Sequence, residues 1–229
     1  MMTPMMAPVM TPMMTPAMTP TSHMLLARLR ARRHGHIGLL GGSFNPAHHG
    51  HAHIADVAIS ELQLDQVIWL VSPQNPHKST HDMAPFADRF ASAEAISRQC
   101  KHHKRMQVSA LEHITQMRYT ADTIRFLAQT CPRVTFYWLM GADNMAPFHH
   151  WHRTDDIIRN AHLIVVNRPG YQASALASRI AHRMTRCPAR RLRHKPFRHK
   201  HHMHHHYWSF IQARLNPLSA TAIRASRQQ

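Results

Sequence analysis

The chain has 229 residues and carries 28 Lys or Arg against 11 Asp or Glu, a formal net charge of +17 with neutral histidines. Hydrophobic residues make up 44% of the sequence, which suffices for the core of one domain and excludes a wholly disordered protein. The longest apolar runs, such as Val134 to Met140, are strand-sized, so we expect no membrane-spanning helix.

The positive charge lies mainly in the terminal parts of the chain. All 11 acidic residues fall between Asp56 and Asp156, where 10 Lys or Arg nearly balance them, whereas residues 157–229 hold 14 Lys or Arg and no acid. Such asymmetry favours attraction to polyanions. No helix-turn-helix, zinc-finger or RNA-recognition signature accompanies it, so we favour solvated basic segments over specific nucleic-acid binding.

The cysteines indicate a reducing environment. Cys100, Cys131 and Cys187 are odd in number and far apart, which provides neither a disulfide framework nor a CxxC zinc site. We therefore expect a cytoplasmic protein.

Residues 1–24 are unlike the rest of the chain. They contain nine Met, five Pro and five Thr and no charged residue, and their regularly spaced prolines oppose both helix and sheet, which predicts a disordered arm. The arginines at 28–33 follow the apolar stretch instead of preceding it, which argues against a secretory signal. A transit peptide and initiation at Met24 are the alternatives.

From His36 onward, short apolar runs alternate with helix-like stretches, which is typical of βαβ units on a parallel sheet. The runs predict strands at Ile37–Leu40, Gln66–Val71, Met106–Ala110, Val134–Met140 and His162–Asn167. The stretches between them predict helices at Gly50–Leu62, Pro85–Cys100, Thr120–Thr130 and Asp155–Asn160. This order predicts a single α/β domain over residues 34–229 with a doubly wound parallel sheet.

The C-terminal part is predicted in less detail. After a turn at residues 168–171 and a further helix-like segment, residues 186–206 are basic, rich in histidine and without apolar periodicity, which predicts a surface loop. Its imidazoles at 194–206 could chelate Ni²⁺ or Zn²⁺, as any such tract can, without implying a biological metal. Tyr207–Ile211 is predicted as a last strand and Ser219–Ser226 as a final helix capped by Ser219.

The loop after the first predicted strand is where a parallel sheet places its ligand. It reads GGSFNPAHHGH from Gly41 to His51. Adjacent glycines let the backbone approach a ligand, and the following helix N-terminus favours phosphate. If that helix begins near Pro46 or Ala47, His48 and His51 lie on one face of its first turn, where both imidazoles can donate to one triphosphate.

This HxGH arrangement resembles the nucleotidylyltransferases with a Rossmann-like fold, and the fuller string resembles the nicotinate-mononucleotide adenylyltransferases of bacterial NAD synthesis. The resemblance implies ATP-binding roles for Gly41, Gly42, Ser43 and Phe44 beside the histidines. The alternatives are a zinc site built from the histidines at 48, 49, 51 and 53, or histidine-rich background. A zinc site would not need the glycines.

A second motif near the C-terminus agrees with the first. Ser219, Thr221 and Arg224 form an SxTxxR string, in which hydroxyls and a guanidinium suit phosphate oxygens. Alone the string is common as a helix cap. The family places the same motif opposite its histidines, which implies that these three residues hold the β- and γ-phosphates and that Arg224 is catalytic together with His48 and His51.

Three further stretches resemble the nicotinate-specific branch. PQNPHK, ending at Lys78, resembles the loop that meets the mononucleotide phosphate, or it is a proline-rich turn with a solvated lysine. YTADT resembles the string whose threonine, here Thr120, lies by the pyridine carboxylate; Thr120 is also the predicted N-cap of a helix. GADN with the later Phe148 and Trp151 resembles the family's GxD…F…W segment.

In that third segment the resemblance implies that Gly141 and Asp143 bind ATP, Asp143 by accepting a hydrogen bond from a ribose hydroxyl. It also implies that Trp151 stacks on the nicotinate ring, the alternative being an ordinary core tryptophan. The resemblance also implies that Arg168 lies near the adenosine side. Asn45 stands where many relatives have aspartate, which weakens any argument for a carboxylate metal ligand in the loop.

The resemblance implies adenylyl transfer from ATP to nicotinate mononucleotide, giving deamido-NAD and pyrophosphate. Mg²⁺ is expected as cofactor, held by the phosphates and water without a protein metal site. A homo-oligomer is compatible with the sequence. The alternatives are a nicotinamide-mononucleotide or pantetheine-phosphate adenylyltransferase, and a basic nucleic-acid-binding module.

Overall fold

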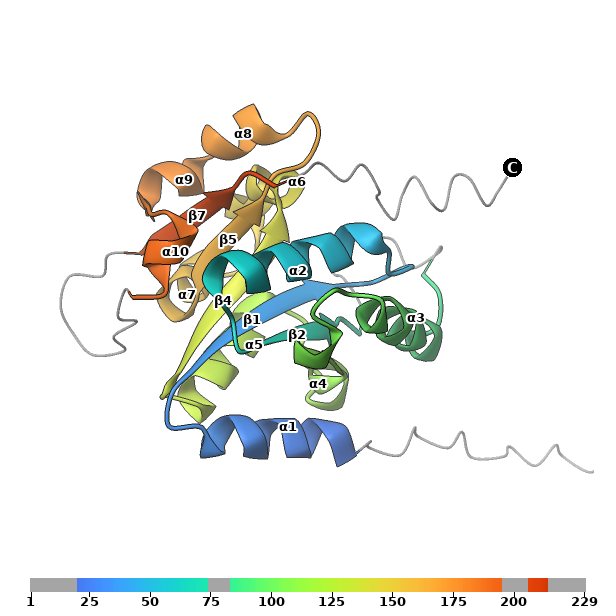
Figure 1. Ribbon diagram of the computed structural model, residues 1–229. Coiled ribbons are helices and arrows are strands. Elements are labelled where there is room, and N and C mark those ends of the chain that lie inside the picture. Colours follow the sequence, from blue (N-terminus) through green and yellow to red (C-terminus); the bar gives the residue numbers. More distant parts are fainter. Residues whose placement is uncertain (1–19, 74–82, 195–205, 214–229) are drawn as a thin grey trace, which may run out of the picture.

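The structure, a computed structural model, describes residues 20–73, 83–194 and 206–213. Its centre is a seven-stranded parallel sheet in the order β3-β2-β1-β4-β5-β7-β6 (Figure 1). The strands are β1 (Gly35–Gly42), β2 (Gln66–Val71), β3 (Met106–Ser109), β4 (Val134–Gly141), β5 (His162–Val166), β6 (Thr185–Arg186) and β7 (Tyr207–Ile211).

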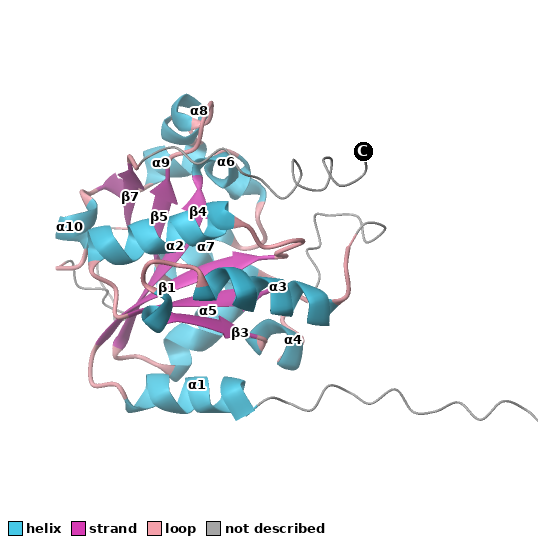
Figure 2. Ribbon diagram, turned by 45° about the vertical axis from the view of Figure 1, so that its right-hand side comes forward, coloured by secondary structure: helices cyan, strands magenta, loops and turns pink. Residues whose placement is uncertain are grey.

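Helices cover both faces of this sheet (Figure 2). The α-helices are α1 (Pro20–Ala31), α2 (His49–Leu62), α3 (Phe86–Arg98), α4 (Leu111–Ile114), α5 (Thr120–Thr130), α6 (Ala142–Met145), α7 (Thr154–Asn160), α8 (Gln172–Leu176), α9 (Arg179–Arg183) and α10 (Ala189–Leu192). Two 3₁₀ turns, η1 (His103–Arg105) and η2 (Pro147–His150), complete the described elements. The predicted doubly wound α/β domain is confirmed.

Alternate side chains of each strand enter two apolar layers. In β4, Phe136 and Trp138 join the layer that contains residues of α1, α5 and α7, whereas Tyr137 and Leu139 join the layer formed with α2, α3 and α10. Both layers are apolar because a parallel sheet is covered on both sides. This explains why the strands read in the sequence as continuous hydrophobic runs.

All five strands predicted between residues 37 and 167 are present, and so is the strand predicted at Tyr207–Ile211. Their ends are shifted by no more than two residues. The predicted helix 120–130 agrees at both ends, and the other three begin or end within two residues of the prediction. The condition set for the histidine geometry, a start of this helix near Pro46 or Ala47, is not met, since α2 begins at His49. The two-residue strand β6 had no signal in the sequence.

Helix α1 corrects the predicted N-terminal boundary. Residues 20–24, assigned to the disordered arm, are helical, and the folded part begins before residue 34. After Pro20 no proline follows until Pro46, and Leu25 and Leu29, four residues apart, are buried in the core at 2% and 1% exposure. Residues 1–19 lie outside the described part.

The basic loop predicted for 186–206 is also corrected. Its first residues form the end of β6 and helix α10, and Cys187, Ala189 and Leu192 are buried against α2 and its neighbours. These apolar side chains are too few and too irregularly spaced to give a periodic signal. Residues 195–205 are outside the described ranges, as is the predicted final helix at 219–226.

None of the helices in the described part of the chain has the length and apolar character needed to cross a membrane.

Candidate active site

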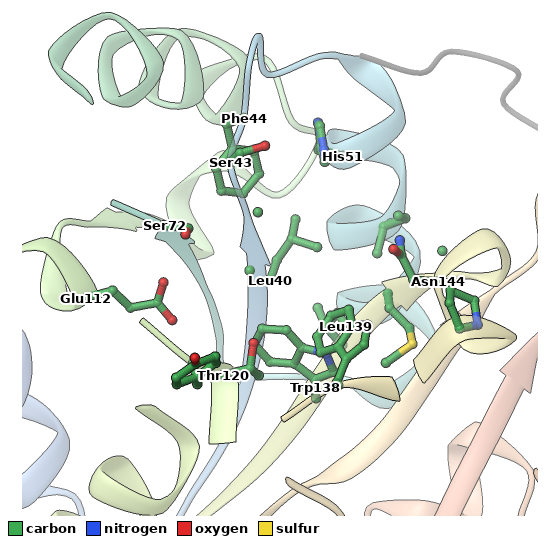
Figure 3. A pocket seen from close by; sticks show the side chains of 18 of the residues that line it. Leu40, Ser43, Phe44, His51, Ser72, Glu112, Thr120, Trp138, Leu139 and Asn144 are labelled. Atoms are coloured by element: carbon green, nitrogen blue, oxygen red, sulfur yellow. The ribbon is translucent and has the colours of Figure 1, made fainter. Parts of the chain in front are cut away.

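A cavity of about 460 Å³ opens at the carboxyl ends of β1 and β4 (Figure 3). After β1 the chain proceeds to β2 and β3 on one side, and it returns to β4 and β5 on the other. Such a reversal of strand order leaves a crevice between the loops that follow the two central strands, which is where open α/β sheets bind ligands. Both the GGSF loop and the Gly141 segment line this cavity.

Gly41 shapes the cavity wall by having no side chain. A Cβ atom at this position would lie 2.2 Å from the Trp138 ring, so only glycine lets that ring lie against β1 and line the cavity. Phe44 has a left-handed backbone (φ 47°), and it is buried, with 1% of its surface exposed. Its ring stacks on Trp69 and meets His51 edge-on, which anchors the loop in the core.

The two histidines of the HxGH motif cap helix α2 reciprocally. His48 is the N-cap residue, with an extended backbone, and its Nδ1 accepts a hydrogen bond of 3.1 Å from the backbone N–H of Gly50. His51, three residues later, accepts at Nδ1 from the backbone N–H of His48 at 3.2 Å. This is a capping box built from imidazoles, and it brings the ring centroids to 3.9 Å.

The capping bonds decide which nitrogens can donate. A backbone N–H only donates, so Nδ1 of each ring is the acceptor and the ring proton of the neutral imidazole is on Nε2. Burial, with smaller contributions from the charges of Arg168 and His49, lowers the pKa of His48 to about 4. His48 is therefore neutral near pH 7, and both imidazoles, which line the cavity, carry an Nε2–H donor.

Arg89 on α3 holds the loops around the cavity in place. Its side chain is 2% exposed and donates to four backbone carbonyls: Ser43 and Ser72 at 2.7 Å, Pro73 at 2.8 Å and Ala84 at 3.0 Å. Burial lowers the pKa of its guanidinium. One planar cation therefore joins the loop after β1 to the loop after β2 and to the start of α3.

Two further hydrogen bonds tie the GGSF loop to α3. The Asn45 side-chain oxygen accepts from the backbone N–H of Ala84 at 3.2 Å, and the Ser92 hydroxyl accepts from the backbone N–H of Ala47 at 3.1 Å. Asn45 thus has a structural partner in the segment before α3.

The opposite end of the cavity is formed by α5 and the segment after η2. Thr120 and Trp151, predicted to contact the mononucleotide, both line the cavity there. Trp151 is half-buried and packs edge-on against Trp138 and Phe148, so its core and cavity roles coincide. Thr120 is the first residue of α5 and not its N-cap: Tyr119 occupies the cap position, without a side-chain cap bond.

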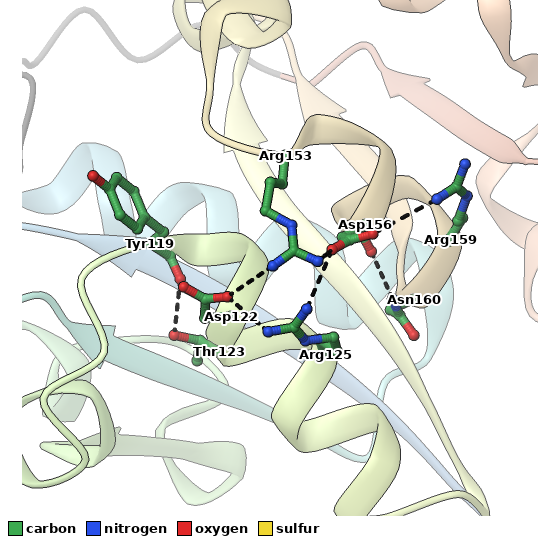
Figure 4. A network of polar contacts seen from close by, with 8 residues as sticks. All are labelled: Tyr119, Asp122, Thr123, Arg125, Arg153, Asp156, Arg159 and Asn160. Carbon is green, nitrogen blue, oxygen red and sulfur yellow. Dashed lines mark hydrogen bonds and ion pairs between the residues drawn. The ribbon is translucent and has the colours of Figure 1, made fainter.

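An ion-pair network fixes the segment that carries Trp151 (Figure 4). Arg153, with a left-handed backbone (φ 51°), pairs with Asp122 of α5 and Asp156 of α7. Arg125 joins the same two carboxylates from α5, at 3.0 Å and 3.6 Å. Arg159 also pairs with Asp156, and the Thr154 hydroxyl donates to the carbonyl of Trp151. The network links the two walls that hold Thr120 and Trp151.

Asp143, predicted to accept from a ribose hydroxyl, is not part of the described cavity wall. Its carboxylate forms an ion pair of 2.7 Å with Arg168, which does line the cavity, as does the neighbouring Asn144. The sequence placed Asp143 at the strand end correctly, but it did not predict the pairing with Arg168, 25 residues away.

The cavity brings together most of the predicted residues that the structure describes: Gly41, Gly42, Ser43, Phe44, His48, His51, Gly141, Thr120 and Trp151. Lys78, Ser219, Thr221 and Arg224 lie outside the described residues. Sequence reasoning missed Ser72, Glu112, Arg118, Tyr119, Asn144, His150 and His152 on the wall. Tyr119, Asn144, His150 and His152 adjoin motif residues, whereas Glu112 had no signal beyond its place after a predicted strand.

Among the residues described, no three His, Cys, Asp or Glu side chains gather as a metal site requires. The alternative of a zinc site from the histidines at 48, 49, 51 and 53 therefore has no support in this part of the chain. His48 and His51 instead bond to the backbone through Nδ1, and His49 is exposed.

Comparisons with known proteins identify the family of the chain. A family model described as cytidylyltransferase-like matches residues 39–226. Two probable nicotinate-nucleotide adenylyltransferases are each 39% identical: that of Brucella abortus (strain 2308) over 195 residues, covering 82% of this chain and 93% of the relative, and that of Rhizobium leguminosarum bv. trifolii over 193 residues, covering 82% and 94%.

The fold has a solved counterpart in the Plasmodium falciparum nicotinic acid mononucleotide adenylyltransferase complexed with NaAD, with a TM-score of 0.63 at 16% identity, covering 84% of this chain and 83% of the other. That likeness concerns the fold alone. The family match and the identity to relatives over nearly their full length establish the kinship: the chain belongs to the nicotinate-nucleotide adenylyltransferases of the cytidylyltransferase-like family.

Proposed function

We propose that this enzyme joins ATP and nicotinate mononucleotide to give deamido-NAD and pyrophosphate. The observation that carries the proposal is a single cavity whose two ends differ in the chemical groups that line them. At one end, the imidazoles of His48 and His51 and the N-terminus of α2 adjoin a glycine-rich loop. At the other end, Thr120 offers a helix start and Trp151 an aromatic face.

The chemistry needs positioning more than it needs a nucleophile from the protein. The 5′-phosphate of the mononucleotide attacks the α-phosphorus of ATP, the bond to the β-phosphate oxygen breaks, and its electron pair leaves with pyrophosphate. Nε2–H groups of His48 and His51 donate to phosphate oxygens on which negative charge increases. Their donors are fixed by the capping bonds and cost no reorganisation during the reaction.

The residues beyond the described ranges complete the proposal. Ser219, Thr221 and Arg224 are proposed to hold the β- and γ-phosphates, and Lys78 the mononucleotide phosphate. Arg168, on the cavity wall and paired with Asp143, is proposed to lie on the adenosine side, with Asp143 fixing its guanidinium in place of the ribose contact first expected.

Mg²⁺ is proposed to enter with ATP, and when bound it neutralises phosphate charge. Near the GGSF loop, the groups on the described wall that could ligate a metal are imidazoles, amides, hydroxyls and backbone carbonyls. The side-chain oxygen of Asn45 already accepts a hydrogen bond from the backbone N–H of Ala84. This set fits a cation ligated by phosphate oxygens and water.

The proposal is tested by incubating the purified protein with ATP, MgCl₂ and nicotinate mononucleotide, and following pyrophosphate release together with deamido-NAD by chromatography. Nicotinamide mononucleotide and phosphopantetheine in parallel reactions test the two alternative acceptors. If neither nicotinate mononucleotide nor nicotinamide mononucleotide causes release of pyrophosphate, the proposal is overturned.

A cytoplasmic location is proposed from the cysteines. The three cysteines are free and buried, which suits a reducing cytoplasm. Nucleic-acid binding by the basic C-terminal segment is the competing activity, and a salt titration of binding to random duplex DNA measures it. A homo-oligomer remains a prediction for solution measurement.

A further inference from the structure

Glu112 is a buried acid on the cavity wall that the proposed reaction does not use. It lies in α4, is 7% exposed, and faces the cavity beside Thr120 (Figure 3). The hydroxyl of Thr123 donates to its Oε1 at 2.9 Å. Within the described residues the Glu112 side chain has no other hydrogen bond, so its Oε2 can contact a group inside the cavity.

The start of α5 lies on the same wall. This helix has 11 residues and no side-chain cap, and its N-cap Tyr119 and first residue Thr120 both line the cavity. The N–H groups of Thr120 and Ala121 have no partner within the helix, whereas those of Asp122 and Thr123 donate to the carbonyl of Tyr119. With the helix dipole, the two remaining N–H groups attract an anion. A carboxylate attracted by these groups would meet a carboxyl group of the protein at Glu112.

We propose that Glu112 is a specificity-determining residue that contacts the substituent on the pyridine ring of the mononucleotide. With a proton on its free oxygen, Glu112 donates to the carboxylate of the nicotinate ring. Ionised, it repels that carboxylate and accepts from the N–H of a nicotinamide carboxamide. The inference rests on the proposed function and adds to it a source of acid-over-amide preference.

Burial supports a protonated form at neutral pH. It raises the pKa of Glu112 to about 7, against the opposing effect of the Thr123 hydrogen bond. A group with this pKa holds its proton in about ten times more molecules at pH 6 than at pH 8. The preference for the acid substrate should therefore fall about tenfold over this range.

Other groups near Glu112 can also titrate or carry charge, and the experiment has to separate them. His113 stacks on Phe86 of α3, Tyr119 stacks on His152, and Arg118, His150 and Arg89 stand around the same end of the cavity or its supporting loops. A histidine that gained charge at low pH would also favour the acid substrate.

The test compares kcat/KM for nicotinate mononucleotide and nicotinamide mononucleotide from pH 6 to pH 8 in wild type and in Glu112→Gln. Titration of the substrate phosphates cancels in the ratio. Glutamine keeps an acceptor for Thr123 and a donor toward the cavity at every pH. We expect the ratio to fall about tenfold in wild type and to stay constant in the variant.

Thr123→Val is the second variant. Valine keeps the shape of threonine and removes the hydroxyl that favours ionised Glu112, so the pH at which the ratio falls should move upward. A constant ratio in wild type, or the same fall in Glu112→Gln, overturns the inference while leaving the proposed function intact. Turnover of neither mononucleotide by wild type overturns both.

Discussion

The imidazoles of His48 and His51 lie 3.9 Å apart and cap the same helix, each accepting a backbone N–H of the motif at its Nδ1. The helix cap uses Nδ1 of each ring, and the proposed phosphate contact uses Nε2. This division makes the two roles separable by substitution.

His51→Ala should keep the fold and lose most turnover. Loss of one Nε2–H donor to the transition state costs about 3 kcal/mol, or about a hundredfold in kcat. Loss of the cap bond costs about 1 kcal/mol of unfolding free energy. Steady-state kinetics and urea denaturation measure the two effects. The exposed neighbour His49→Ala is the control, and near-normal kcat in His51→Ala would refute the role.

His48→Asn separates the cap from the donor. Asparagine is a good N-cap, so the unfolding free energy at pH 7 should change little, whereas the absence of an imidazole Nε2–H should lower kcat about a hundredfold. Normal turnover in this variant would contradict a role for the His48 ring in phosphate binding.

The same variant tests the pH dependence of stability. The pKa of His48 is about 4 in the folded protein, below its ordinary value of 6.5, so the unfolded chain takes up the proton first as pH falls. The contribution of this group is full above pH 6.5 and is lost between pH 6.5 and pH 4, by about 3 kcal/mol. Denaturation curves at pH 7 and pH 4 should show this extra loss in wild type and not in His48→Asn.

Arg89→Lys should weaken ATP binding. A lysine keeps the charge, but its ammonium lacks the planar fork that reaches the carbonyls of Ser43, Ser72 and Pro73 together. We expect KM for ATP to rise about tenfold, equivalent to about 1.4 kcal/mol. Arg98→Lys, at the exposed end of the same helix, is the matched control. Unchanged KM in Arg89→Lys would show that the loops keep their places without the guanidinium.

Asp156→Ala should act on the mononucleotide side of the cavity. It removes the carboxylate that Arg125, Arg153 and Arg159 share, although Arg125 and Arg153 keep Asp122. We expect this loss to cost about 1–2 kcal/mol of unfolding free energy. Because Arg153 fixes the segment after Trp151, KM for nicotinate mononucleotide should rise while KM for ATP stays the same.

The control for this variant is Glu94→Ala, which removes an exposed i,i+4 ion pair with Arg98 and should change stability by less than about 0.5 kcal/mol. Equal KM values for both substrates in wild type and Asp156→Ala would show that the network serves stability alone.

Local patterns sufficed to predict the strands and the phosphate-side residues. Strands such as Gln66–Val71 are buried on both faces and so read as apolar runs, and the HxGH string is contiguous. Helix α1 was missed because the arm's prolines reach to its first residue, and its two buried leucines alone are a weak signal.

Residues whose role depends on distant partners could not be found in this way. Arg89 donates to the carbonyl of Ser43, 46 residues away in the sequence, and Asp143 forms an ion pair with Arg168, 25 residues away. Glu112 is buried because α4 and α5 close over it, which no spacing in the sequence encodes. Tertiary packing decides these positions.

Strand β1 receives its second neighbour late in synthesis. Until β4 is translated, the edge of β1 that pairs with β4 in the folded sheet has no partner, and its amide and carbonyl groups are open to pairing with another chain. Leu25 and Leu29 belong to the same apolar layer as Phe136 and Trp138 of β4, so they lack these contacts until then. We therefore expect the nascent chain to be most prone to aggregation before β4 is translated.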